Sequence, residues 1–149
     1  MAMEEARMRV AFVSPVVSGV SGGYRKYMQE LVPMIAADPR VEWAQVYTGP
    51  QVVKFHHIDS SLITAWPDGD PWAFLWLKSK IKEERADVVF VPTAYWLDCG
   101  DIPVVTMVRN TEPLLVPFAG NSLVDGFKNL LRARFARQAS RHADRIIAV

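Results

Sequence analysis

The chain has 149 residues, of which 50% are hydrophobic and 22% are charged, and its formal net charge is +1 at pH 7. This length fits a single domain with a buried core, and the near-neutral charge excludes a global electrostatic attraction to nucleic acid or anionic lipid. The lone Cys99 cannot form an internal disulfide, and the acidic start lacks the pattern of a signal peptide. Both features predict a cytoplasmic protein, with membrane association as the alternative, and no apolar run approaches the roughly 18 residues of a spanning helix.

The first readable elements are a strand and a helix. Residues 1–7 show no hydrophobic period, and we expect them to be a disordered or expression-derived tail outside the fold. Met8–Ser14 (MRVAFVS) is a nearly continuous apolar run, typical of a strand with helices on both faces of its sheet. The helix that follows ends near Ala37, and Pro33 predicts a kink in it. Its predicted core stripe is Tyr24, Tyr27, Met28, Leu31 and Ile35.

The loop between this strand and this helix is a candidate phosphate site. Strand, glycine turn and helix in this order place a helix N-terminus at the carboxyl edge of a sheet, where backbone N–H groups lack intrahelical acceptors. Ser21 is the predicted N-cap, and the amides of Gly22, Gly23 and Tyr24 are the predicted donors. The alternative is a tight turn in which the glycines supply positive φ. The spacing matches neither the dinucleotide fingerprint nor a P-loop, so no NAD and no other cofactor is predicted.

The middle of the chain continues the alternation of strands and helices. Val41–Thr48 predicts the second strand, and one of two weaker candidates, residues 52–58 and 61–66, is expected to join the sheet. A helix is predicted from Asp70-Pro71 to about Glu84. Its expected inward residues are Phe74, Leu77 and Ile81, while Trp72 and Trp76 are expected to pack under the preceding loop, with a partner or lipid interface as the alternative.

The last third predicts two buried strands and a long basic helix. Residues 87–92 and 103–108 are short β-branched runs, and residues 144–149 begin a further strand. Ser122 opens a capping box ahead of a helix that runs through Phe127, Leu130, Leu131, Phe135 and Ala139. Five cations on this helix form either a solvated face or a membrane patch: Lys128, Arg132, Arg134, Arg137 and Arg141. The predicted fold is α/β, a Rossmann-like doubly wound and mostly parallel sheet with Met8–Ser14 central.

These motifs, in this order, resemble the N-terminal domain of GT-B glycosyltransferases of family 4. The similarity rests on RVAFVSP, the SGG turn at Ser21 to Gly23, DVVFVP, PVVTMV and the closing ADRIIAV at Ala143 to Val149. The resemblance implies that residues 8–149 are the acceptor-side domain of a retaining enzyme, and that a C-terminal donor-binding domain lies outside this sequence. It also implies a nucleotide-sugar donor, with a glycan, a lipid or a small molecule as acceptor, and no turnover by this polypeptide alone.

The resemblance also suggests site residues. The family's Gly-Gly turn approaches the donor diphosphate and the acceptor, which corresponds to Gly22 and Gly23. Where the family usually has a histidine after the fifth strand, this chain has Arg109, whose guanidinium can contact a phosphate but cannot act as a neutral imidazole. In the same loop lie Asn110, Thr111 and Glu112; we expect Glu112 to accept a hydrogen bond from an acceptor hydroxyl, with a solvated loop carboxylate as the alternative. Arg109 and Glu112 are thus the predicted catalytic residues, and both loops are expected to meet at one cleft mouth.

Other classes remain as alternatives or are excluded. His56 and His57 are adjacent and would point to opposite faces of a strand, and Cys99 and His142 offer no ligand spacing, so no metal site is predicted. Nucleic acid is not a predicted partner, because the positive charge is confined to one helix without a recognition motif. Two alternatives to transfer are a non-catalytic α/β ligand-binding or scaffolding domain and one half of a sugar-nucleotide 2-epimerase.

Overall fold

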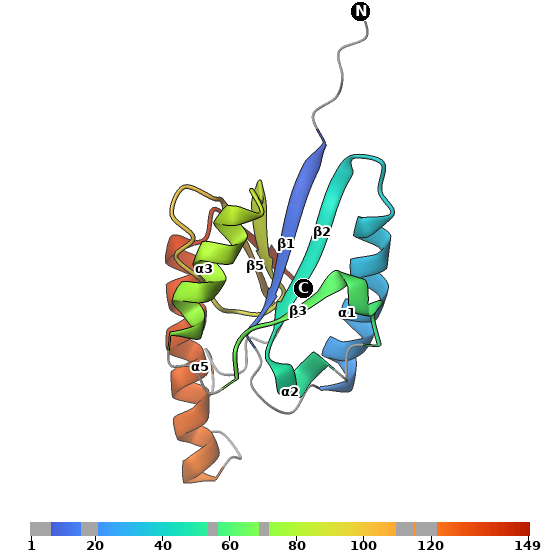
Figure 1. Ribbon diagram of the computed structural model, residues 1–149. Coiled ribbons are helices and arrows are strands. Elements are labelled where there is room, and N and C mark those ends of the chain that lie inside the picture. Colours follow the sequence, from blue (N-terminus) through green and yellow to red (C-terminus); the bar gives the residue numbers. More distant parts are fainter. Residues whose placement is uncertain (1–6, 16–20, 54–56, 69–71, 110–114, 116–121) are drawn as a thin grey trace, which may run out of the picture. The chain divides into compact units, whose positions relative to one another are not determined.

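Strands and helices alternate along the chain in the computed structural model, which describes residues 7–15, 21–53, 57–68, 72–109, 115 and 122–149 (Figure 1). The chain divides into two units, Met1–Val89 and Phe90–Val149, and each is described by itself. The strands are β1 (Met8–Ser14), β2 (Val41–Thr48), β3 (Ile63–Ala65), β4 (Val88–Val91), β5 (Val104–Val108) and β6 (Arg145–Ala148). The helices are α1 (Gly22–Ala36), α2 (Pro50–Val53), α3 (Ala73–Glu83) and α5 (Leu123–His142), with a 3-10 turn at Ser60–Leu62.

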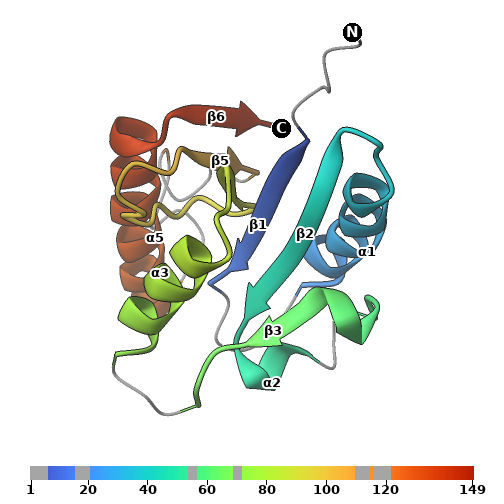
Figure 2. The ribbon, with the colours of Figure 1, turned by 45° about the horizontal axis from the view of Figure 1, so that its top comes forward.

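The strands form one parallel sheet in the order β3-β2-β1-β4-β5-β6. This is the doubly wound order, so the predicted α/β class and the central position of β1 are confirmed. Figure 2 shows β3, β2 and β1 side by side. In the β1–β2 register, Val10 lies opposite Ala44, and Ser14 opposite Thr48. The strand order reverses beside β1, which is the position where open α/β sheets bind ligands.

Two helices cover opposite faces of β1. Alternate side chains of a strand point to opposite faces, so Ser14 shares a face with Phe12 and Val10, while Arg9 shares the other with Val13. The Tyr24 hydroxyl donates to Ser14 Oγ, which places α1 on the first face. Arg9 Nε donates to the Glu84 carbonyl at the end of α3, which places that end on the second face. Burial on both faces explains why β1 reads as a continuous apolar run.

The core of α1 differs in part from the predicted stripe. Tyr24, Met28 and Val32, spaced four residues apart, are the buried side chains. Three predicted core residues are only half-buried: Tyr27, Leu31 and Ile35. The buried row of α1 therefore includes Val32, which was not in the predicted stripe. The helix also continues through Pro33, whose exposed ring faces solvent.

The segment between β2 and β4 agrees with the prediction in part. One of the two strand candidates joins the sheet as predicted, because the second forms β3, and Pro50–Val53 is a short helix. Asp70 and Pro71 lie outside the described residues, and Trp72 is the N-cap of α3, without a side-chain cap bond. Leu77 and Ile81 are buried as predicted. The side chains of Trp72 and Phe74 are 68% and 43% exposed, so their predicted burial is wrong: only the later turns of α3 reach the core.

In the second unit, polar contacts join β5 to its neighbours. The Val104 amide donates to Asp144 Oδ2 over 2.8 Å, and Asp144 N donates back to the Val104 carbonyl, just before β6. Thr106 Oγ1 lies 2.6 Å from the Thr93 carbonyl and 2.9 Å from that of Tyr95, so its proton is shared between two loop carbonyls. These bonds fix the loop after β4 against β5.

The long helix α5 is present, and it includes the residues of the predicted pattern. Ser122 caps it as predicted, since Asp125 N donates to Ser122 Oγ over 3.2 Å. Its buried residues are small or polar: Gly126, Asn129, Ala133, Ala136 and Ala139. Four large residues of the predicted helix pattern are instead exposed: Phe127, Leu130, Leu131 and Phe135. The buried side of α5 is therefore the one with small side chains, and the large ones lie on its exposed side.

All four residues of β6 are exposed, in contrast to the buried strands β4 and β5. None of the described helices is both long and apolar enough to cross a membrane.

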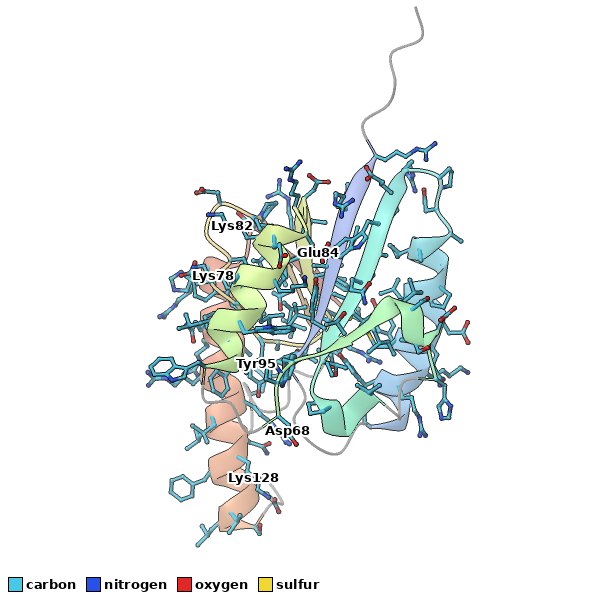
Figure 3. The ribbon with its side chains drawn as sticks, in the orientation of Figure 1. Asp68, Lys78, Lys82, Glu84, Tyr95 and Lys128 are labelled. Carbon is cyan, nitrogen blue, oxygen red and sulfur yellow. The ribbon has the colours of Figure 1, made fainter. Side chains whose placement is uncertain are left out.

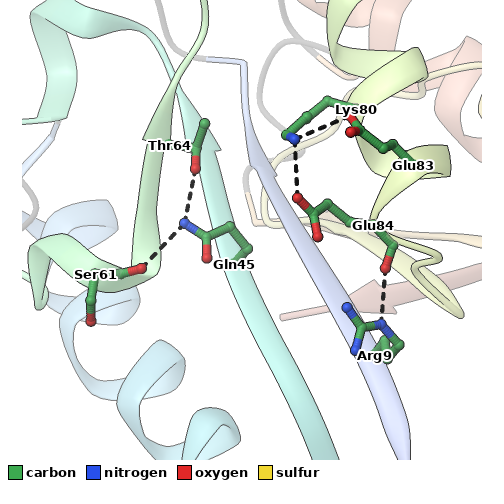
Figure 4. Close-up of polar contacts among 7 residues, drawn as sticks. All are labelled: Arg9, Gln45, Ser61, Thr64, Lys80, Glu83 and Glu84. Atoms are coloured by element: carbon green, nitrogen blue, oxygen red, sulfur yellow. Dashed lines mark hydrogen bonds and ion pairs between the residues drawn. The ribbon is translucent and has the colours of Figure 1, made fainter.

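Arg9 ties three elements of the first unit together, and its loss tests this packing (Figure 4). Besides Glu84, its guanidinium contacts Glu42 Oε1 at 2.9 Å and lies 5.0 Å from the Trp43 ring centroid. We predict that Arg9→Ala lowers the free energy of unfolding by about 2 kcal/mol, because a charge-assisted bond to the α3 C-terminus and the stacking on Trp43 are both lost. Urea unfolding measures the change.

The control is Arg40→Ala, which removes the same side chain from an exposed pair with Asp38 on the surface. It is expected to leave stability unchanged within error, because exposed ion pairs contribute little. Equal losses for the two variants would contradict the role given to Arg9.

Candidate functional site

The N-terminus of α1 presents backbone donors at the carboxyl end of the central strand. Ser21 has extended backbone angles (φ −63°, ψ 146°), and its Oγ accepts from Tyr24 N over 3.3 Å. Its carbonyl accepts from Arg25 N, which starts the helical ladder. The Tyr24 amide, predicted to be a ligand donor, is therefore occupied by the cap. The amides of Gly22 and Gly23 remain as the helix N–H groups without an intrahelical acceptor.

The two glycines are exposed, and the backbone does not require one at position 22. Among the described glycines only Gly100 has a positive φ, of 68°, so the alternative of a positive-φ turn is wrong for Gly22. A Cβ built on Gly22 would meet no atom within 4 Å. Neither backbone strain nor steric crowding explains why position 22 is a glycine. Its effect is to leave the outward side of the first turn open to the close approach of a ligand.

Polar side chains lie beneath this helix end. The Tyr24 hydroxyl donates to Ser14 Oγ over 2.9 Å in a buried contact. Thr48 is in register with Ser14, so its side chain shares the face of the sheet that α1 covers. Thr48 is 0% exposed, and its Oγ1 makes no hydrogen bond with any described residue. A buried hydroxyl without a partner costs about 1–3 kcal/mol, so this group needs a physical explanation, of which a bound water or ion is one.

The electrostatics at this end of α1 favour an anion. No acidic side chain in the first turn of α1 offsets the partial positive charge of the helix N-terminus. Two cationic residues, Arg25 and Lys26, follow directly in the sequence. On the opposite face of the sheet, burial and then the Glu84 carboxylate raise the pKa of Tyr47 to about 12. That phenol stays protonated at neutral pH. Among the described residues at the α1 N-terminus, the backbone amides can bind and orient an anion.

The predicted residues of the second loop are only partly described. Arg109 directly follows β5, is exposed, and makes a contact of its own. Asn110, Thr111 and Glu112 lie outside the described residues. The structure thus brings Ser21, Gly22 and Gly23 together, and the predicted meeting of this turn with the loop at Arg109 stays a prediction.

Sequence reasoning missed the polar layer made by Ser14, Tyr24 and Thr48. One signal was available: Ser14 and Thr48 are the polar last residues of two apolar strands, and the ends of adjacent parallel strands lie at one edge. The position of the Tyr24 hydroxyl could not be read from periodicity, which marked the residue only as core. Among the described residues, no group of three His, Cys, Asp or Glu side chains could hold a metal ion, and His56 lies outside them.

Comparison with known proteins assigns no family: no protein-family model matches the chain, and no curated protein matches it.

Gly22→Ala separates a structural from a ligand-binding role for the first glycine. We predict that this variant is as stable as the wild type or about 0.5 kcal/mol more stable, because alanine fits the helical backbone and has fewer unfolded conformations. Ser21→Ala is the comparison, and it should lower stability by about 1 kcal/mol through loss of the cap. Thermal unfolding of both variants is the measurement, and a marked loss of stability in Gly22→Ala would return that glycine to a purely structural role.

Thr48→Val tests the orphan hydroxyl. The change replaces the buried Oγ1 by a methyl group of similar size, and we predict a gain of about 1 kcal/mol in unfolding free energy, since the penalty for an unsatisfied hydroxyl disappears. Tyr24→Phe is the control in the same layer, and it should lose stability because its hydroxyl is bonded to Ser14. A destabilised Thr48→Val protein would mean that Oγ1 is satisfied in solution.

Proposed function

We propose that this chain is the acceptor-side domain of a retaining GT-B glycosyltransferase, which moves a sugar from a nucleotide-sugar donor to a glycan, lipid or small-molecule acceptor. Two observations support the proposal. The first is the resemblance of the sequence motifs, the Gly-Gly turn among them, to glycosyltransferase family 4. The second is the doubly wound sheet, in which the helix that begins at Gly22 is the next element after the central strand.

The single observation that carries the proposal is the exposed start of α1 at Gly22, where the glycine serves no internal purpose. Sugar transfer from a nucleotide donor must stabilise a departing diphosphate, and without a metal this falls to helix N-termini and cations. The Gly22 and Gly23 amides supply the first of these. In this proposal Arg109 supplies the cation, and Glu112 accepts a hydrogen bond from an acceptor hydroxyl.

The alternative of a self-contained ligand-binding domain makes a different prediction for this polypeptide. In the proposed enzyme the nucleoside is held by a second domain, so we predict that this chain binds uridine and guanosine diphosphate sugars more weakly than about 1 mM in calorimetric titration. Micromolar binding would overturn the proposal and indicate a self-sufficient nucleotide site. An epimerase half would share the weak binding, and product analysis of the two-domain polypeptide separates it from a transferase.

Site variants in a polypeptide that carries both domains complete the test. Gly23→Val should block the close approach of the diphosphate. Arg109→Ala should remove up to a few kcal/mol of transition-state stabilisation and lower the turnover rate accordingly. Turnover is measured beside the melting temperature, because both variants should stay folded. Full activity in Arg109→Ala would remove that residue from the site, and a collapse of stability in Gly23→Val with normal activity per folded molecule would remove the turn.

A further inference from the structure

The solvent side of α5 carries a continuous stripe of unusual composition. Side chains spaced three and four residues apart lie on one face of a helix. On α5 such a row, here called the α5 stripe, is apolar in its first half and cationic in its second: Leu123, Phe127, Leu130, Arg134, Arg137 and Arg141. All six residues are exposed, with Leu123 at 77% and Phe127 at 65%. Val124 and Leu131 widen the apolar half.

This exposure is more than the scatter of apolar residues found on any surface. The free energy gained by burying one large aliphatic or aromatic side chain is about twofold to several-fold that gained by burying an alanine methyl group. Nevertheless, α5 buries Ala133, Ala136 and Ala139 and leaves its large apolar side chains exposed. Contiguous exposed apolar patches of this kind mark interaction sites.

The charges of α5 define what the stripe can bind. The helix α5 carries five lysine and arginine residues and one acidic residue, Asp125. The hydrogen bond from the Ser122 hydroxyl, and then Lys128, lower the pKa of Asp125, so it stays ionised and compensates Lys128 at 3.5 Å. Within the described part of the chain, no ion pair involves Arg134, Arg137 or Arg141. Three guanidinium groups are thus available to an anionic partner.

The rest of α5 is anchored to its own unit, so the stripe stays turned outward. Phe135 stacks on Tyr95 with ring centroids 4.9 Å apart, and His142 lies against Trp96 at the same distance. Figure 3 shows Tyr95 beside α5 and Lys128 on the first half of the helix. The small residues Gly126 and Ala133 hold another side of it inward.

We propose that the α5 stripe docks on the surface of a bilayer that contains anionic phospholipids. A bilayer offers an apolar layer beneath a layer of phosphates. The stripe matches that order when the N-terminal, apolar half of α5 points into the bilayer and the arginine half lies at the phosphates. Guanidinium groups bind phosphate through two parallel N–H donors. A second copy of the chain fits less well: a two-fold pairing would set apolar halves against arginine halves, or arginines against arginines. This inference does not depend on the proposed glycosyl transfer.

Cosedimentation of the whole chain with lipid vesicles tests the proposal. We expect binding to vesicles of phosphatidylcholine mixed with phosphatidylglycerol, little binding to phosphatidylcholine alone, and loss of binding as salt is raised. The triple variant Arg134→Gln, Arg137→Gln, Arg141→Gln should lower the partition coefficient about a hundredfold, at up to about fivefold per cation. The double variant Leu123→Ser, Leu131→Ser should lower it at least about tenfold by removing inserted apolar area.

Matched controls lie on α3, where Leu75 is also an exposed leucine and Lys82 an exposed cation. Leu75→Ser and Lys82→Gln should bind vesicles as the wild type does, and melting temperatures verify that every variant is folded. Failure of the wild-type chain to bind anionic vesicles would overturn the proposal, and so would equal effects of the α3 and α5 variants. A concentration-dependent dimer that Leu123→Ser, Leu131→Ser abolishes, with no vesicle binding, would identify the stripe as a contact between copies instead.

Discussion

The geometry of the first unit depends on one buried hydrogen bond, from the Tyr24 hydroxyl to Ser14 Oγ. Ser14 is the last residue of the central strand, and Tyr24 lies in the first turn of α1. The bond therefore fixes where the helix starts relative to the carboxyl edge of the sheet. Both partners are buried, so breaking it would leave polar atoms without solvent. The direction of the Gly22 and Gly23 amides follows from this contact and from the Ser21 cap.

Chemistry at this edge is limited by what the fold leaves available. The cap occupies the Tyr24 amide, burial keeps the Tyr47 phenol protonated, and α1 has no acid in its first turn. Among the described residues of this edge, the start of α1 is suited to binding an anion. The same edge is where the strand order reverses, which is the position where open α/β sheets bind ligands.

Much of this fold could be predicted from the sequence, because its strongest signals are local. Continuous apolar runs marked β1, β4 and β5, and serines followed by helical patterns marked both the Ser21 and Ser122 caps. The sequence predicted the helix α5 but not which of its faces is buried. In α5 a small-residue face and a large-residue face share the helical period, and periodicity alone cannot tell which one packs inward. Periodicity does not predict which side chains meet across elements. It therefore could not predict the hydrogen bond between Tyr24 and Ser14, nor that the Thr48 hydroxyl lies in register with Ser14 without a partner among the described residues.

The proposed function requires that the start of α1 binds a diphosphate through the amides of Gly22 and Gly23. An amide NMR titration of this chain with inorganic pyrophosphate tests this binding. We predict saturable shifts, at concentrations on the order of millimolar, that are largest at the Gly22 and Gly23 amides and are weakened in a fully folded Gly22→Ala protein. Shifts spread over surface lysines and arginines, with these two amides unchanged, would contradict it.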